Sequence, residues 1–288
     1  MKDYNKTGLE LIRERASLLD ELRWFFAQQN VLEVQIPVLS KHTVTDPEIN
    51  SIRVPGYGYL QTSPEFLMKR LLSSGSPSIY SIGPAFRDQE VGRYHRSEFI
   101  MIEWYRIGLN DTELIEEIKA LLNLVLGEAD YRELTYQEVL ESINEKDVEE
   151  DLRFSLGCQK LNPGRFIIND YPAHKAVLAR LDEDDSDVAR RFEFIIDGLE
   201  LANGYFELND YSEHVARFAR DNQIRKEREL PLIDVDEDFL GSIGKGLPFC
   251  SGVAMGFDRL LMLKTGSNDI GTVQLLSLIH ISEPTRPY

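Results

Sequence analysis

Apolar residues recur at helical spacing near the start of the chain. Leu11, Leu18 and Leu22 fall along one face of a helix, which predicts an amphipathic helix over about residues 9–29. The next segment, VLEVQIPVLS at 31–40, alternates as a strand does. Its proline favours an edge or interface strand, because proline cannot donate a ladder hydrogen bond. The pattern therefore predicts a helix followed by an edge strand.

The segment TSPEFLMKRLLSSG at 62–75 carries the start and stop signals of a short helix. Thr62 and Ser63 are candidate caps, and Pro64 suits the first turn. Gly75 suits the end of the helix. We therefore expect one short helix within this segment.

The rest of the pattern is clear in some segments and weak in others. DTELIEEIKALLNLVLG at 111–127 predicts another amphipathic helix, whereas residues about 130–190 show no dominant period. The acidic run DEDDSD in that range is typical of a solvated loop or face. No internal repeat divides the chain, and no linker rich in proline, glycine or serine marks a domain boundary.

A polar loop separates two predicted strands within FRDQEVGRYHRSEFIMIEWYR. If residues 98–106 are extended, one face is apolar, and the other mixes an aromatic ring, a carboxylate and a phenol. The mixed face carries Phe99, Met101, Glu103 and Tyr105. A ring can stack on a base and the acid and phenol can receive an ammonium group, while Arg87 is placed to clamp a phosphate or carboxylate. A surface hairpin with ordinary ion pairs is the alternative interpretation.

A second hairpin is predicted around Asp197-Gly198, a strong two-residue turn signal between alternating segments. That turn places Ile195 opposite Glu200, so Glu193 lies diagonally from Glu200 at roughly 7 to 8 Å. Two carboxylates at this spacing can bind Mg²⁺ together with substrate phosphates. An exposed face with two mutually repelling acids is the alternative.

The segment CSGVAMGFDRLLMLKTG predicts a strand of small residues followed by an apolar helix. Gly256 allows a ligand to approach the backbone closely. Arg259 at the helix start adds to a field that favours phosphate. A capped helix without a ligand explains this short pattern equally well.

Composition narrows the function classes. With 42% hydrophobic and 28% charged residues the chain is an ordinary globular protein. No apolar stretch reaches the roughly 20 residues that span a bilayer, and no signal peptide is visible, so we expect a cytoplasmic protein without a membrane partner. The net charge of −17 argues against extensive nucleic-acid contact, although a local basic patch remains compatible with it. Cys158 and Cys250 predict neither a disulfide framework nor a zinc site.

Several segments together resemble the motifs of class II aminoacyl-tRNA synthetases. FRDQE and RYHRSEF are similar to motif 2, GVAMGFDRLLML to motif 3, and the first helix with VLEVQIPVLS to motif 1. TSPEFLMKRLL, EFIMIEWYR and GLELANGYFELND resemble the lysyl branch, and most of all the elongation factor P–lysine ligases. The resemblance implies an α+β fold in which an antiparallel β-sheet is flanked by helices, with a homodimer formed through motif 1. It assigns residues 1–276 to one catalytic domain and leaves 277–288 as a tail of doubtful origin.

The resemblance implies roles for the matching residues. Arg87 would contact the α-phosphate and the substrate carboxylate in the catalytic step, and Arg259 the γ-phosphate. The other residues expected to bind ATP are Gln89, Glu90, His95, Arg96, Phe99, Glu200, Leu201 and Gly256. Those expected to bind the amino acid are Ser63, Pro64, Glu65, Glu103, Tyr105, Asn203, Tyr205, Glu207 and Ala254. The expected ligands of Mg²⁺ are Glu193 and Glu200.

Some of these positions have a second interpretation or depart from the family pattern. Thr62-Ser63-Pro64-Glu65 is also a capping-box pattern, in which the glutamate only closes the helix start. Gln89 stands where motif 2 usually has a glutamate that receives the adenine amino group; its amide oxygen can accept that bond, or Glu90 can take over. Arg96-Ser97 replaces the usual Asn-Pro, and Tyr205 replaces a usual phenylalanine.

The implied reaction is the ATP-dependent activation of lysine as an adenylate and its transfer to a lysine side chain of elongation factor P. Ala254 stands where lysyl-tRNA synthetases usually carry glycine, which favours (R)-β-lysine; the alternative is that this methyl simply packs well. Motif 1 begins almost at Met1, which leaves no room for an N-terminal anticodon-binding domain, so tRNA is not the expected acceptor. The rival interpretations are a truncated synthetase making lysyl adenylate for tRNA or dinucleotide synthesis, and a non-catalytic regulatory paralogue.

Overall fold

A central sheet of eight strands organises this computed structural model, which describes residues 8–144 and 147–275. The strand order is β1-β5-β6-β13-β12-β11-β8-β7. Neighbours are antiparallel except at the two ends, where β1 pairs with β5 and β7 with β8 in parallel. The strands are β1 (Leu32–Glu33), β5 (Ile79–Phe86), β6 (Glu98–Ile107), β7 (Tyr131–Thr135), β8 (Arg165–Asn169), β11 (Arg191–Ile196), β12 (Leu199–Phe206) and β13 (Cys250–Gly256). The predicted α+β class with a flanked antiparallel sheet is confirmed.

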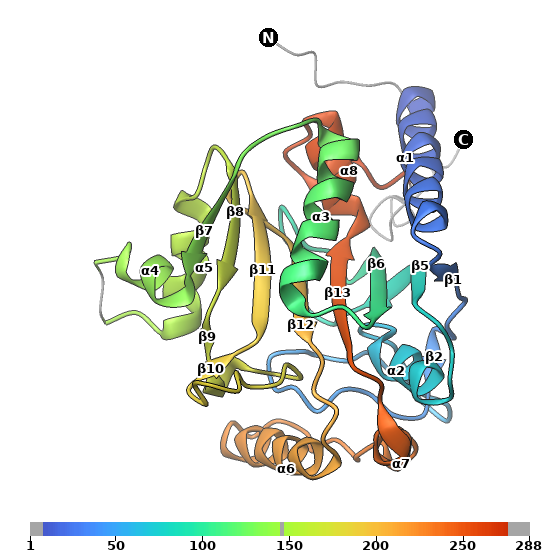
Figure 1. Ribbon diagram of the computed structural model, residues 1–288, viewed down its shortest axis with the longest axis vertical. Helices are drawn as coiled ribbons and strands as arrows, with labels where there is room; N and C mark the ends of the chain where they lie inside the picture. The colour runs from blue at the N-terminus through green and yellow to red at the C-terminus, as the bar shows by residue number, and fades with distance from the viewer. Residues whose placement is uncertain (1–7, 145–146, 276–288) are drawn as a thin grey trace, which may run out of the picture.

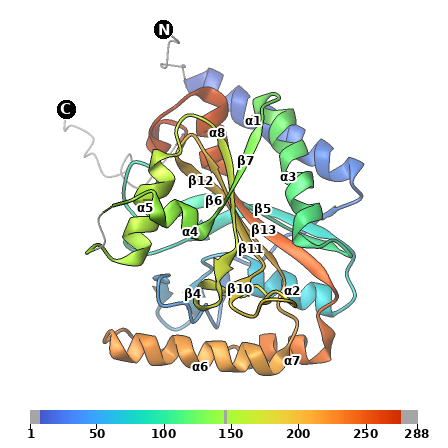
Figure 2. The same ribbon diagram turned by 60° about the vertical axis from the view of Figure 1, so that its left-hand side comes forward.

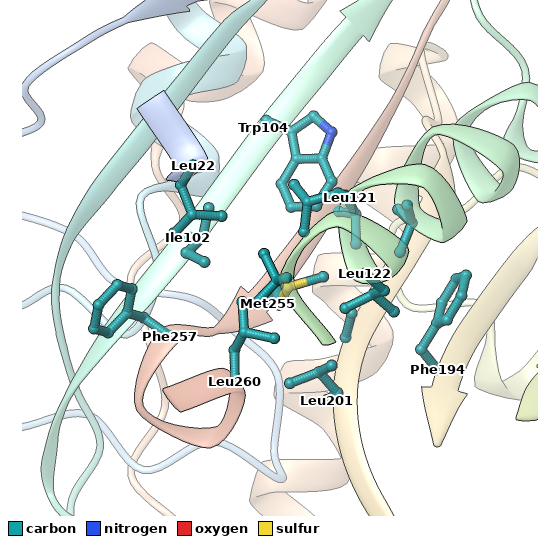
Figure 3. Packing of buried hydrophobic residues seen from close by; sticks show 14 of the residues in the cluster. Leu22, Ile102, Trp104, Leu121, Leu122, Phe194, Leu201, Met255, Phe257 and Leu260 are labelled. Carbon is teal, nitrogen blue, oxygen red and sulfur yellow. The ribbon is translucent and has the colours of Figure 1, made fainter. Parts of the chain in front are cut away.

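Three helices cover one face of this sheet: α1 (Gly8–Gln28), α3 (Asp111–Leu126) and α8 (Phe257–Thr265) (Figure 1). Their apolar stripes and the inward residues of the central strands form the main core. Trp104 and Ile102 of β6, Met255 of β13 and Leu122 of α3 meet there (Figure 3). Each of these side chains is almost fully buried, so this layer supplies most of the apolar stabilisation of the fold.

The opposite side of the sheet is bounded by α2 (Glu65–Ser73), α6 (Tyr211–Glu227) and α7 (Glu237–Gly246). In Figure 2 α6 and α7 form a base beneath the sheet. A small sheet of order β2-β4-β3 lies on this side, formed by β2 (Leu39–Ser40), β3 (Arg53–Val54) and β4 (Gly58–Leu60).

A peripheral group of short elements packs beside β7 and β8 (Figure 1). It consists of α4 (Tyr136–Glu141), α5 (Glu150–Lys160), the strand pair β9 (Tyr171–Pro172) with β10 (Val188–Ala189), and the 3₁₀ helix η1 (Ala173–Lys175). A second 3₁₀ helix, η2 (Ile270–Thr272), follows α8. The group has its own small core around Tyr136, Phe166 and Tyr171.

Most predicted elements are present at the predicted places. The four predicted helices are α1, α2, α3 and α8, and Gly75 after α2 takes a positive φ of 93°. The acidic run is exposed except for Asp182, which is half-buried and pairs with Arg190 at 2.8 Å. The interpretation of 31–40 as one strand is wrong: only the two-residue strands β1 and β2 form there, the first at the sheet edge. Pro37 lies between them, where it cannot donate to a ladder.

The second hairpin forms around the predicted turn, with both Asp197 and Gly198 at positive φ. Ile195 lies opposite Glu200 as predicted. A register shift between Phe194 and Ile195 adds one residue on β12, so that Asn203 lies opposite Glu193. The predicted diagonal relation between Glu193 and Glu200 is therefore not that of a regular hairpin. The shift could not be read from the alternation of the sequence.

The division into a domain over 1–276 and a tail stays a prediction, and residues 277–288 lie outside the described part of the chain. Among the described residues, no helix is long and apolar enough to cross a membrane.

Candidate active site

A cavity of about 800 Å³ opens on the face of the sheet that α1, α3 and α8 do not cover. Strand β6 shows why: Ile102 and Trp104 point into the apolar core, while Phe99, Glu103 and Tyr105 line the cavity. The predicted two-faced strand is therefore present. The volume falls within the usual range for ligand sites, roughly 300–1,000 Å³.

The cavity gathers most of the residues that the sequence singled out, although they lie far apart in the chain. The predicted residues that line it are Ser63, Glu65, Arg87, Glu90, His95, Arg96, Phe99, Glu103, Tyr105, Glu200, Leu201, Asn203, Tyr205, Glu207, Ala254, Gly256 and Arg259. Three predicted residues are not in its lining. Gln89 is exposed on the loop after β5, Pro64 is buried at the start of α2, and Glu193 is buried and paired with Arg191.

One end of the cavity is rich in arginine. Arg259 donates from Nη1 to the backbone oxygen of Glu200 at 2.6 Å, and its Nη2 lies 2.8 Å from His95 Nε2. The guanidinium of Arg87 lies 5.4 Å from the centre of the Phe99 ring and 3.7 Å from a Glu90 oxygen. Burial and the charge of Arg259 lower the pKa of His95, which favours the neutral form of its imidazole. This end therefore presents fixed cations and an aromatic face, as a nucleotide requires.

The other end is rich in carboxylates. Glu65 and Glu207 both contact the ammonium group of Lys69, at 2.7 and 2.6 Å. Glu103 accepts a hydrogen bond from the Tyr105 hydroxyl at 2.7 Å, and its second oxygen is buried without a hydrogen-bond partner. Burial and then the charge of Glu65 raise the pKa of Glu103 to about 8. Because an ammonium group satisfies such oxygens, this end is suited to an amine.

The helix-cap interpretation of Glu65 is wrong. The Ser63 hydroxyl does accept a hydrogen bond from the Glu65 backbone N–H at 3.1 Å, but the Glu65 carboxylate turns to Lys69. The helix start is thus closed by Ser63 alone, and the carboxylate is available to the cavity.

Glycine at position 252 allows the Glu207 carboxylate and the Tyr105 ring to lie close to the backbone of β13. A Cβ built on Gly252 would lie 2.4 Å from Glu207 Oε1 and 2.4 Å from the Tyr105 ring. Ala254, two residues on, is paired with Glu103 on one side and with Asn203 on the other. The middle strand β13 therefore needs small side chains on its cavity face.

Arg191 of β11 holds neighbouring polar side chains of β11 and β12 in place by hydrogen bonds. Its guanidinium donates to Glu193 at 2.7 Å and to the Asn203 amide oxygen at 3.3 Å, and the Asn203 amide nitrogen donates to the Tyr205 hydroxyl at 3.2 Å. These bonds fix the polar groups of β12 that face the cavity.

The two predicted metal ligands lie on the hairpin β11–β12 in different surroundings. The Glu193 carboxylate is buried and paired with Arg191, whereas the Glu200 side chain is about half exposed (48%) and lies 3.7 Å from Arg259. Burial and then the charge of Glu200 raise the pKa of Glu193 to about 7. Within the described residues no group of three or more His, Cys, Asp or Glu side chains surrounds a metal position. Glu200, which is the more exposed of the two and lines the cavity, fits a cation that takes one or two carboxylates and completes its shell with phosphates and water, as Mg²⁺ does.

The sequence analysis missed several residues that shape the cavity, namely Asp46, Lys69, Lys175, Arg191 and Gly252. For Lys69 a signal existed: it follows Glu65 by four residues on a helix, which predicts an ion pair. The spacing alone suggests a surface pair, and only the packing of α2 buries it.

Comparison with known proteins agrees with this geometry. The family described as tRNA synthetases class II (D, K and N) matches residues 3–278. The chain belongs to this family. Among its relatives, the elongation factor P–(R)-β-lysine ligase of Vibrio cholerae is 40% identical, covering 92% of this chain and 94% of that protein. The ligases of the same name from Vibrio parahaemolyticus and Photorhabdus laumondii are each 38% identical, covering 92% of this chain and 95% and 94% of theirs.

Class II synthetases use ATP, so the arginine-rich end of the cavity is the expected nucleotide site of this family member. Arg259→Ala and Arg87→Ala should each reduce amino-acid-dependent ATP–pyrophosphate exchange by a hundredfold or more. Loss of one charge-stabilising donor in a preorganised site costs about 2.7–4 kcal/mol. The control is Arg70→Ala, which removes a surface pair with Asp238 at 3.8 Å. Near-normal exchange in either cavity variant, with the fold retained by circular dichroism, contradicts the site.

Proposed function

We propose that this protein activates (R)-β-lysine with ATP as an aminoacyl adenylate and transfers the aminoacyl group to a lysine side chain of elongation factor P. The observation that supports the proposal is the division of one cavity into an arginine-rich end and a carboxylate-rich end. The names of the relatives supply the substrate class. If ATP binds at the arginine-rich end and the ammonium groups of the amino acid at the carboxylate-rich end, the carboxylate of the amino acid lies between them, next to the phosphates.

At the arginine-rich end, Phe99 stacks on the adenine, Arg87 contacts the α-phosphate together with the substrate carboxylate, and Arg259 binds the γ-phosphate. Glu90, His95, Arg96, Leu201 and Gly256 complete the nucleotide site. Glu90 takes the adenine amino group in this proposal, because Gln89 is exposed while Glu90 lines the cavity.

At the carboxylate-rich end, Glu65, Glu103 and Glu207 receive the ammonium groups of the amino acid. Ser63, Tyr105, Asn203 and Tyr205 supply hydrogen bonds around it, and Ala254 limits the space. Glu200 would hold Mg²⁺ at the cavity lining, and Glu193, which is buried and paired with Arg191, would join it as the second carboxylate; the bound ion would neutralise phosphate charge.

The chain itself contributes position and charge rather than a nucleophile. A carboxylate oxygen of the amino acid attacks the α-phosphorus, and the bond to pyrophosphate breaks. Arg87 holds the attacking carboxylate and the phosphate in line and stabilises the charge that develops. The acceptor amine, after losing a proton, then attacks the carbonyl carbon, an amide bond forms and AMP leaves.

A homodimer and a cytoplasmic location belong to the same proposal. Trp24 of α1 is 57% exposed and Leu32 of β1 is 55% exposed, and Leu39 of β2 is exposed as well. These apolar side chains belong to the segment that resembles motif 1, so a second copy of the chain is the partner that we expect to cover them. The acceptor is a translation factor, which places the reaction in the cytoplasm.

The decisive experiment offers the protein ATP, labelled lysine isomers and two acceptors, elongation factor P and tRNA. We expect (R)-β-lysine to be used in preference to α-lysine, and label to appear on elongation factor P. Label on tRNA instead favours a lysyl-tRNA synthetase-like enzyme. Absence of adenylate with either isomer favours a non-catalytic protein.

The metal assignment predicts a change in magnesium dependence. Glu200→Gln removes a hard anionic ligand, so the Mg²⁺ concentration for half-maximal exchange should rise severalfold. Glu183→Gln, in the exposed acidic run, is the matched control. An unchanged Mg²⁺ requirement in the first variant would return Glu200 to a solvent-facing role.

The isomer preference is predicted to depend on the methyl group of Ala254. That methyl faces the cavity between Glu103 and Asn203, where the α-ammonium group of α-lysine would lie. Ala254→Gly should therefore relax the preference for (R)-β-lysine by about tenfold, since one methyl contributes about 1–3 kcal/mol of steric discrimination. The measurement is kcat/KM for adenylate formation with each isomer. Equal ratios in wild type and variant would show that the alanine only packs.

A further inference from the structure

Lys69 is a fully buried cation at the floor of the carboxylate-rich end. Its ammonium group lies 2.7 Å from Glu65 Oε1 and 2.6 Å from Glu207 Oε2, and its side chain has no solvent exposure. A buried ammonium group is unfavourable unless it is paired. Burial disfavours the charge of Lys69, but Glu207 and Glu65 outweigh burial and raise its pKa, so Lys69 stays charged.

The two glutamates come from elements that are distant in the chain. Glu65 begins α2, whereas Glu207 directly follows β12. The Glu207 carboxylate also lies against the backbone of Gly252, where a Cβ would come within 2.4 Å of its oxygen. Lys69 thus connects the helix to the sheet through the carboxylates that face the cavity.

The group as a whole has an unusual charge balance. Glu65, Glu103 and Glu207 are close enough that their charges interact, and Lys69 is the cation placed among them. With the three carboxylates ionised, as bound ammonium groups favour, Glu65, Glu103, Glu207 and Lys69 together have a formal charge of −2. A lysine isomer carries two ammonium groups besides the carboxylate that Arg87 would hold.

We propose that Lys69 is a positioning residue of the amino-acid site: it holds Glu65 and Glu207 as converging carboxylates and sets a pocket charge that matches an amino acid with two ammonium groups. The proposal rests on the proposed function for the identity of that amino acid. Glu65 and Glu207 line the cavity whereas the fully buried Lys69 does not, so Lys69 acts on the substrate through these carboxylates.

The surroundings of the group make its ionisation sensitive to Lys69. The charged and titratable groups that act on it from the neighbouring elements are Tyr105 on β6, Arg180, Tyr205 on β12, His214 on α6 and Cys250 on β13. Burial and then the charge of Lys69 lower the pKa of His214 to about 4, so His214 is neutral and cannot replace the cation. Burial raises the pKa of Glu207 to about 7, even though Lys69 lowers it.

Removing the cation should therefore raise the pKa of Glu207 further, so that this group is protonated near pH 7. The variant Lys69→Met should raise KM for the amino acid by about thirtyfold at pH 7, as loss of one partner of a buried charge pair does. The KM should fall again as pH rises and Glu207 ionises. The kcat should change much less, because the reacting carboxylate lies at Arg87. Lys69→Arg, which keeps the charge, should recover part of the loss.

A second measurement uses no substrate. When the pKa of a group is higher in the folded than in the unfolded protein, the free energy of unfolding falls as pH rises between the two pKa values. Lys69→Met should therefore lower the melting temperature little at about pH 5 and increasingly toward about pH 8.5. Lys69→Met/Glu207→Gln removes the titrating group and should abolish most of this slope.

The matched control is Lys264→Met, which removes a lysine paired with both oxygens of Glu21 at 2.6 and 2.7 Å outside the cavity. Its effect on the melting temperature should not change across the same pH range. The inference is overturned if the change in melting temperature caused by Lys69→Met is likewise independent of pH. It is also overturned if the KM of this variant stays within about threefold of wild type at every pH. A wild type that makes no adenylate refutes the proposed function instead, and leaves the substrate-free measurement to decide on Lys69.

Discussion

The alternation of side chains across the central strands is the constraint on which the rest of this protein depends. In β6 and β13 one set of residues joins the apolar core beneath α3 and α8, and the other set forms the floor of the cavity. The strand register therefore determines both faces together, because a shift of one residue would place Glu103 in the core and Trp104 in the cavity. The fold is stable and the site is polar for the same geometric reason.

This constraint brings carboxylates and cations into a poorly solvated space, where each charge needs a partner. Arg191 holds Glu193, and Lys69 holds Glu65 and Glu207. Glu103 has only the Tyr105 hydroxyl, and its second oxygen has no hydrogen-bond partner. Among the described residues of the cavity most charges thus have a partner within the protein, and the free oxygen of Glu103 can be paired by an ammonium group of a ligand.

The two ends of the cavity explain how a chain with net charge −17 can serve as a nucleotide-binding enzyme. The overall charge opposes contact with extended phosphate backbones, but a few arginines fixed at one end of a cavity suffice for a single nucleotide. Arg259 is held by a backbone oxygen and His95, so its position does not depend on the ligand. Such preorganised charge is what adenylate formation requires, because the reaction uses no nucleophile of the protein.

The sequence by itself determined the helices α1, α2 and α3, the two-faced strand β6 and the turn at Asp197-Gly198, and most of the site residues that it singled out line the cavity. These features depend on local periodicity, on turn chemistry or on motifs whose residues are contiguous. The sequence alone did not reveal that 31–40 is mostly irregular, because its alternation is satisfied by packing at a sheet edge rather than by a ladder.

Only the tertiary structure decided which charges meet. The i to i+4 spacing of Glu65 and Lys69 predicts a pair, but its burial and its third member, Glu207, depend on how α2 packs beneath the sheet. The register shift in β11–β12 likewise decided that Glu193 has Asn203 as its cross-strand partner. Local sequence fixes which faces are apolar, whereas the partners of a buried charge come from residues far apart in the chain, and burial sets how strongly they interact.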